Sequence, residues 1–198
     1  MTENMNVIQK QQKRELEKIE ICMDILKNAR NELYLSMRFF DVALNKLELM
    51  PTAEIQGVGT DGFLFCFYPD YVIGLYKSYP VQVNRGLLHT MLHCLFQHLP
   101  TENSENQNHI NIEETHWNLA CDIVVESMID DIQKSCVRKY KSPYRKAVYQ
   151  KLRESLDVLT PKGVYRKLLQ MQLNESEFQK MQLEFWVDDH AMWNHNVP

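Results

Sequence analysis

Apolar residues recur at helical spacing along the first part of the chain. From Val7 to Leu49 the sequence contains no glycine or proline, and apolar side chains repeat at the period of an amphipathic helix. This pattern predicts one long helix, or two helices joined near Asn31. Pro51 ends the segment, because proline lacks the backbone N–H group that a helix interior requires.

The pattern changes after Pro51 to β-branched and aromatic residues interrupted by glycines. Three short strands are predicted, at residues 55–59, 63–68 and 71–76. Asp61-Gly62 and Pro69-Asp70 are typical turn sequences between them. Together these segments predict a small antiparallel meander.

Helical periodicity returns in the second half of the chain. One apolar run begins near Val83 and ends by Leu99, since Pro100 disfavours helix at the residue before it. A second helix is predicted from Glu113 to about Ile132, after a polar loop at residues 101–111.

Two further sequences mark helix starts. Ser142-Pro143 and Thr160-Pro161 each place an N-cap residue before a proline at the first helical position, so two or three more helices follow. The whole pattern predicts an α+β fold that is predominantly helical, with a small three-stranded antiparallel sheet. We expect a helical extension over residues 1–30 and a single domain over residues 31–198.

Composition narrows the class of protein. The 198 residues are 44% hydrophobic and 24% charged, with a net charge of -4, which gives no general basis for binding nucleic acid. The five cysteines form no C-x-x-C pair, and no apolar run approaches the ~20 residues that span a bilayer. We expect a cytoplasmic protein with reduced thiols and no membrane contact.

Charge is unevenly distributed along the sequence. Residues 134–153 hold eight lysines and arginines: Lys134, Arg138, Lys139, Lys141, Arg145, Lys146, Lys151 and Arg153. Such a stretch is typical of a solvated helix face, and the alternative is a docking surface for an acidic partner.

Two histidines in an apolar run carry the main chemical signal. His89 and His93 are four residues apart, so on a helix they lie roughly 40° apart on one face, and both rings can reach a single Zn²⁺. The spacing matches the zinc-protease motif H-E-x-x-H, whose glutamate is the general base. Here that position is Thr90, which cannot accept a proton near neutral pH.

The third metal ligand is predicted on the next helix. Asp122 lies among apolar residues, where an ionised carboxylate is costly unless it is paired or binds a metal. His98 is the alternative ligand, but on a continuous helix it would be rotated about 140° from His93, so it could turn back only if the helix ends near Gln97.

Other polar residues are candidates for supporting roles. Asn118, one turn before Asp122, and His190 and Asp189 in the C-terminal tail are predicted to contact a ligand or a substrate. Glu126, like Asp188 and Asp189, is a possible substitute for the missing general base.

Several short segments occur in an order that resembles a known family. The segments are Met37-Arg38-Phe39-Phe40-Asp41, Val58-Gly59-Thr60-Asp61-Gly62, Asn84-Arg85, Trp117-Asn118-Leu119-Ala120-Cys121-Asp122 and Asp188-Asp189-His190-Ala191-Met192-Trp193. In this order they resemble the zincin-like metallopeptidase domain found N-terminal to von Willebrand factor A domains. The resemblance covers roughly residues 30 to 195.

The resemblance implies a zincin-like fold, zinc held by the histidine helix, and partnership with a MoxR-type AAA+ ATPase or a von Willebrand factor A domain. His89 and His93 match the family's two histidines, and Asp122 matches the aspartate of its W-N-x-A-x-D segment, whereas Thr90 does not match the glutamate. Relatives continue into the A domain, so this chain is expected to be a fragment or a stand-alone version.

Three functional hypotheses follow. We favour a pseudo-peptidase, a metal-binding module that serves as an adaptor for an ATPase. The alternative is an active zinc peptidase with a non-standard general base. The third is a helical scaffold whose histidines bind no metal.

Overall fold

The computed structural model describes residues 2–99 and 113–194. The first half holds helix α1 (Thr2–Ser36), a short 3₁₀ turn, helix α2 (Asp41–Lys46), strands β1 (Glu48–Pro51), β2 (Val58–Thr60) and β3 (Leu64–Phe67), and helices α3 (Pro69–Ser78) and α4 (Pro80–Leu95). The second half holds α5 (Glu114–Ile132), α6 (Pro143–Arg153), α7 (Pro161–Met171), α8 (Glu175–Phe185) and the 3₁₀ helix η3 (His190–Asn194). The α+β, predominantly helical class is confirmed.

The small sheet is mixed rather than wholly antiparallel. Its strand order is β1-β3-β2, with β2 antiparallel to β3 and β1 parallel to β3. The predicted strand at residues 71–76 is wrong, because these residues form part of α3, which begins with proline at its first position. The third strand is instead the edge strand β1, whose first two residues, Glu48 and Leu49, the predicted helical segment had included.

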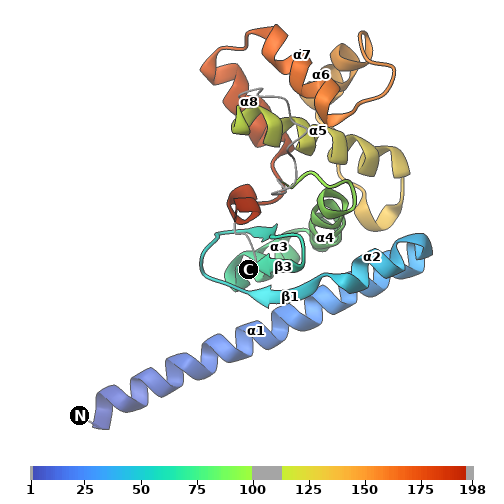
Figure 1. Cartoon of the computed structure of the whole chain (residues 1–198). Coiled ribbons are helices and arrows are strands. Elements are labelled where there is room, and N and C mark those ends of the chain that lie inside the picture. The colour runs from blue at the N-terminus through green and yellow to red at the C-terminus, as the bar shows by residue number, and fades with distance from the viewer. Residues whose placement is uncertain (1, 100–112, 195–198) are drawn as a thin grey trace.

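The helices pack in two groups that share α5. In Figure 1, α1 runs diagonally along one side, beneath the sheet, α3 and α4, while α5 to α8 lie on the opposite side. One apolar core contains residues of the elements from α1 through α4, together with Val125 and Ile129 of α5. A second core contains Leu119 and Ile123 of α5 and residues of α6, α7 and α8. Helix α5 therefore presents apolar residues to both groups.

Helix α1 continues across the predicted boundary at residue 30. It is one helix to Ser36, and its residues from Cys22 onward supply buried side chains to the first core, including Leu26 and Leu33. The division into an extension and a domain therefore remains a prediction. Among the described residues, no helix combines the length and the apolar character that a membrane crossing requires.

The local signals for the later helices are confirmed. Ser142 Oγ accepts a hydrogen bond from the backbone N–H group of Arg145 at the start of α6, and Thr160 Oγ1 accepts one from Gly163 at the start of α7. The polar loop predicted at residues 101–111 lies outside the described residues.

Candidate metal centre

Four side chains from three separate segments meet in the interior. His89 and His93 come from α4, Asp122 from α5, and Asp188 from the segment between α8 and η3. One ligand atom from each lies within 4.8 Å of every other, and all four residues are buried. They form a cluster that could hold a metal ion, which we call the His/Asp cluster.

The two histidines present the same ring atom to the cluster. Nε2 of His93 lies 2.8 Å from Nε2 of His89. Two neutral imidazole nitrogens at this distance repel each other through their lone pairs unless a proton or a cation lies between them. The i,i+4 spacing on α4 thus brings both rings together, as the sequence predicted.

The carboxylates complete a set of nitrogen and oxygen atoms. Oδ1 of Asp122 lies 3.4 Å from Nε2 of His89 and 3.3 Å from Nε2 of His93. Oδ1 of Asp188 lies 3.4 Å and 4.0 Å from the same two nitrogens. Zinc bonds of ~2.0–2.1 Å in a tetrahedral site separate neighbouring ligand atoms by about 3.3 Å. Most of these distances match that separation.

One oxygen of the cluster has an unsatisfied position. Oδ1 of Asp122 is buried and accepts no hydrogen bond of acceptable geometry from the described residues, although His190 Nε2 is only 3.1 Å away. His190 contributes positive charge but no well-aligned donor, and a bound cation would complete the coordination of this buried oxygen. The donor set of two imidazoles and two carboxylates could therefore hold a metal ion.

Electrostatics keep both carboxylates ionised. Burial raises the pKa of Asp122, but the charge of His190 and contacts with His89 and His93 outweigh burial, so its pKa lies below the usual value. Burial also raises the pKa of Asp188, but the charges of His190 and His93 and the contact with His89 outweigh burial. The pKa of Asp188 therefore lies well below the usual value. Anionic oxygens are the form that a cation binds.

His190 closes the cluster from the C-terminal side. Its Nε2 lies 3.0 Å from Oδ1 of Asp188, and its ring stacks on Trp193 with ring centroids 3.9 Å apart. Burial lowers the pKa of His190, yet Asp122 and Asp188 together raise it to about 10. The predicted contact between His190 and the site is therefore present, with both carboxylates as its partners.

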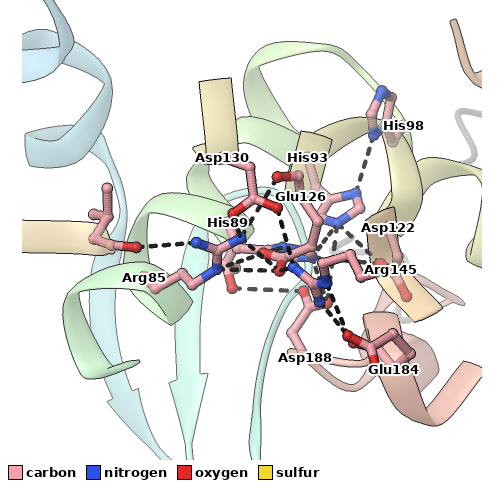
Figure 2. A network of polar contacts seen from close by, with 12 residues as sticks. Arg85, His89, His93, His98, Asp122, Glu126, Asp130, Arg145, Glu184 and Asp188 are labelled. Carbon is pink, nitrogen blue, oxygen red and sulfur yellow. Dashed lines mark hydrogen bonds and ion pairs between the residues drawn. The ribbon is translucent and has the colours of Figure 1, made fainter. Parts of the chain in front are cut away.

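A second buried network lies behind His89. Nδ1 of His89 is 3.1 Å from Oε1 of Glu126, and Oε2 of Glu126 pairs with Arg85 at 2.8 Å and with Arg145 at 2.6 Å (Figure 2). Asp130, one turn further along α5, also pairs with Arg85 at 2.8 Å. Because its oxygens are engaged in this way, Glu126 holds His89 from behind and does not face the ligand atoms.

His98 holds the other histidine. Helix α4 ends at Leu95, Gln97 adopts a left-handed conformation with φ 55°, and the chain then turns His98 back to place its Nδ1 3.0 Å from Nδ1 of His93. Burial and the neighbouring His93 lower the pKa of His98 to about 3. His98 thus contacts His93 on the edge opposite the cluster and is not among the four converging residues.

The remaining candidates have distinct positions. Thr90 is fully buried, and its hydroxyl lies 3.5 Å from Oδ2 of Asp188. The Asp189 carboxylate accepts a hydrogen bond from the backbone of Ala191, and its own backbone N–H group donates to Val58. Asn118 is half-buried and forms no hydrogen bond to the cluster within the described part of the chain.

The sequence did not identify Asp188 as a ligand or Arg85 and Arg145 as partners of Glu126. The sequence did contain a signal for the arginine partners. Glu126 and Asp130 are spaced i,i+4 on an apolar helix, and such carboxylates require cationic partners when they are buried. Comparisons with family models, curated proteins and solved structures found no match to this chain.

Proposed function

We propose that this protein binds one zinc ion through His89, His93, Asp122 and Asp188, and that it is a pseudo-peptidase that serves as an adaptor for a protein partner. The observation that carries the proposal is the convergence of four buried ligand atoms, one from each residue, together with a buried Asp122 Oδ1 that accepts no hydrogen bond from the described residues. The metal would link α4, α5 and the segment before η3.

The number of protein ligands favours a structural site over a catalytic one. Structural zinc sites are closed by four protein ligands, whereas catalytic sites keep one position for water. Asp188 supplies the fourth ligand here, and the whole cluster is buried. When bound, zinc would act as a clamp that contributes folding free energy.

The residue beside the cluster supports the same conclusion. A peptidase of the H-E-x-x-H type uses a glutamate at the position of Thr90, and a threonine hydroxyl cannot act as a general base at neutral pH. Glu126, which contacts His89, is paired with Arg85 and Arg145. These features support a binding role over hydrolysis.

The partner proposed is a MoxR-type AAA+ ATPase or a von Willebrand factor A domain. This part rests on the sequence resemblance and on the order of its motifs. It is tested by measuring binding of the zinc-loaded protein to a purified MoxR-type ATPase and to a purified A domain. If the protein binds neither of them, the adaptor role is overturned. The metal site is tested by a separate measurement.

The metal site is tested by elemental analysis of the purified protein. We expect one zinc per chain in the wild type and loss of zinc in His89→Ala, Asp122→Ala and Asp188→Ala. Asp189→Ala is the matched control, because it removes an adjacent carboxylate that, among the described residues, accepts a hydrogen bond from the backbone of Ala191 and contacts none of the four proposed ligands. Absence of zinc from wild-type protein prepared in zinc-containing medium overturns the proposal.

A further inference from the structure

A basic cavity lies at the C-terminal end of α5, and none of the four residues of the His/Asp cluster is in its lining. It has a volume of about 640 Å³, and six cationic side chains line it: Arg85, Lys134, Arg138, Lys139, Lys141 and Lys146. Asp130 is the one carboxylate in the lining that the structure describes. The cavity therefore collects most of the charge that the sequence concentrates after residue 134.

Two of these cations already have partners. Arg85 pairs with Glu126 and Asp130, and Nζ of Lys141 donates to the backbone carbonyl of Asp130 at 3.4 Å. The other four, Lys134, Arg138, Lys139 and Lys146, form no ion pair with any carboxylate of the described residues. Such a group of like charges repels itself unless an anion lies among them.

Lys139 is the cation of the lining whose surroundings most favour an anionic ligand. Its side chain is half-buried, and it forms no hydrogen bond within the parts of the chain that the structure describes. Burial lowers its pKa; Arg145 and Arg85 lower it further, while Glu126 and Glu184 act in the opposite direction. Removing an ammonium group from water without a partner is costly, so the site favours an anionic ligand.

We propose that this cavity binds a small ligand that carries two or more phosphate groups. Its volume lies in the range of ~300–1,000 Å³ typical of small-molecule sites. Four unpaired cations match the charge of linked phosphates better than that of a single carboxylate. Tyr140, which is 79% exposed and also lines the cavity, offers a ring on which a nucleoside base can stack.

The experiment is isothermal titration of the purified protein at low salt with inorganic tripolyphosphate, a nucleoside triphosphate and orthophosphate. We expect tripolyphosphate to bind at least about tenfold more tightly than orthophosphate, and binding to weaken as salt is raised. Tighter binding of the nucleoside triphosphate would identify a nucleotide site, and equal binding would identify a site for the phosphates alone. Zinc is measured after each titration, because polyphosphates also bind zinc.

Substitutions locate the binding to this cavity. Lys146→Gln and Lys139→Gln should each weaken tripolyphosphate binding by about fivefold, the effect of losing ~1 kcal/mol of charge attraction. Lys151→Gln is the matched control, because it removes one exposed charge from the same helix α6 outside the cavity lining. Lys146 is exposed, so its substitution tests the site even where Lys139→Gln fails to fold.

Three results would overturn the proposal. The first is no binding of tripolyphosphate or of the nucleotide, and the second is equal weakening by Lys151→Gln and Lys146→Gln. The third is tighter binding of an acidic peptide such as polyglutamate, which would make the cavity part of a protein-docking surface.

Discussion

Glu126 and His89 meet at 3.1 Å between Oε1 and Nδ1, on the edge of the imidazole opposite the His/Asp cluster. An ionised carboxylate at this position accepts a hydrogen bond from the Nδ1–H group, so that Nε2, which faces Asp122 and Asp188, is the ring nitrogen that would bind a metal. Burial raises the pKa of Glu126, but His89 and the two arginines hold it well below its usual value. Glu126 thus fixes the ring of a proposed metal ligand in its binding tautomer.

Glu126→Gln should weaken zinc binding by roughly 10- to 100-fold, because the amide no longer orients His89 through a charge. The measurement is a competitive titration with a zinc-binding dye. Asp130→Asn is the control, since Asp130 also pairs with Arg85 but does not contact His89. Equal weakening by both substitutions would mean that the arginine network, and not the contact with His89, controls affinity.

Gly59→Ala should lower zinc affinity without altering any ligand. A Cβ atom at Gly59 would lie 2.5 Å from the backbone oxygen of Asp189, so the segment that carries Asp188 must move. Zinc affinity measured by chelator competition should fall, with secondary structure unchanged. Gly74→Ala is the control, because its Cβ would meet nothing within 4 Å. Unchanged affinity in Gly59→Ala would contradict a role for Asp188 as a ligand.

Arg145→Met should destabilise the protein by about 3–5 kcal/mol in urea unfolding, because it leaves Glu126 buried with fewer positive partners. The comparison is Arg153→Gln, which breaks the exposed pair with Asp131 at 2.7 Å and should change stability by no more than about 1 kcal/mol. Similar effects of the two substitutions would show that the buried arginine network contributes little to the free energy of unfolding.

Removal of zinc by a chelator should lower the unfolding temperature. At free zinc about 1,000 times the dissociation constant, binding adds roughly 4 kcal/mol, which corresponds to about 8–16 °C for a chain of this size. Differential scanning calorimetry with and without chelator measures the shift. The unfolding temperature of Asp188→Asn should change little when chelator is added. If the unfolding temperature of the wild type also changes little, zinc does not stabilise the fold.

Thr90→Glu should not produce hydrolysis of a peptide substrate. The new carboxylate would lie in a buried site near Oδ2 of Asp188, which is 3.5 Å from the present hydroxyl, and like charges there should destabilise the fold by roughly 2–4 kcal/mol. Thr90→Ser is the control that keeps the hydroxyl. Peptide cleavage by Thr90→Glu that disappears on adding His93→Ala would instead indicate a latent catalytic site.

Local signals in the sequence predicted the elements that carry most of the site. Helix α5 was expected from Glu113 to about Ile132 and spans Glu114–Ile132. The i,i+4 rule placed His89 and His93 on one face of α4, and the cost of burying a carboxylate identified Asp122. The helices could be predicted because each depends on residues within one segment, whereas the role of Asp122 as a metal ligand stays a prediction.

The parts that sequence analysis missed depend on distant contacts. Strand β1 exists because Glu48–Pro51 pairs in parallel with β3, and no local pattern reports that pairing. The helix α3 was hidden because the turn-like Pro69-Asp70 also begins a helix and Ile73 favours strands. Asp188 reaches the cluster only through a chain segment that hydrogen-bonds to Val58 by way of Asp189.

The sequence separation of the four ligands has a consequence for biosynthesis. His89 and His93 leave the ribosome first, Asp122 follows, and Asp188 comes only after α8 has been made. During translation, the nascent chain therefore contains His89 and His93 before Asp188 has been synthesised. If the four residues bind zinc as proposed, full-affinity binding can follow only after the C-terminal segment has been synthesised, and zinc content would report that this segment has docked.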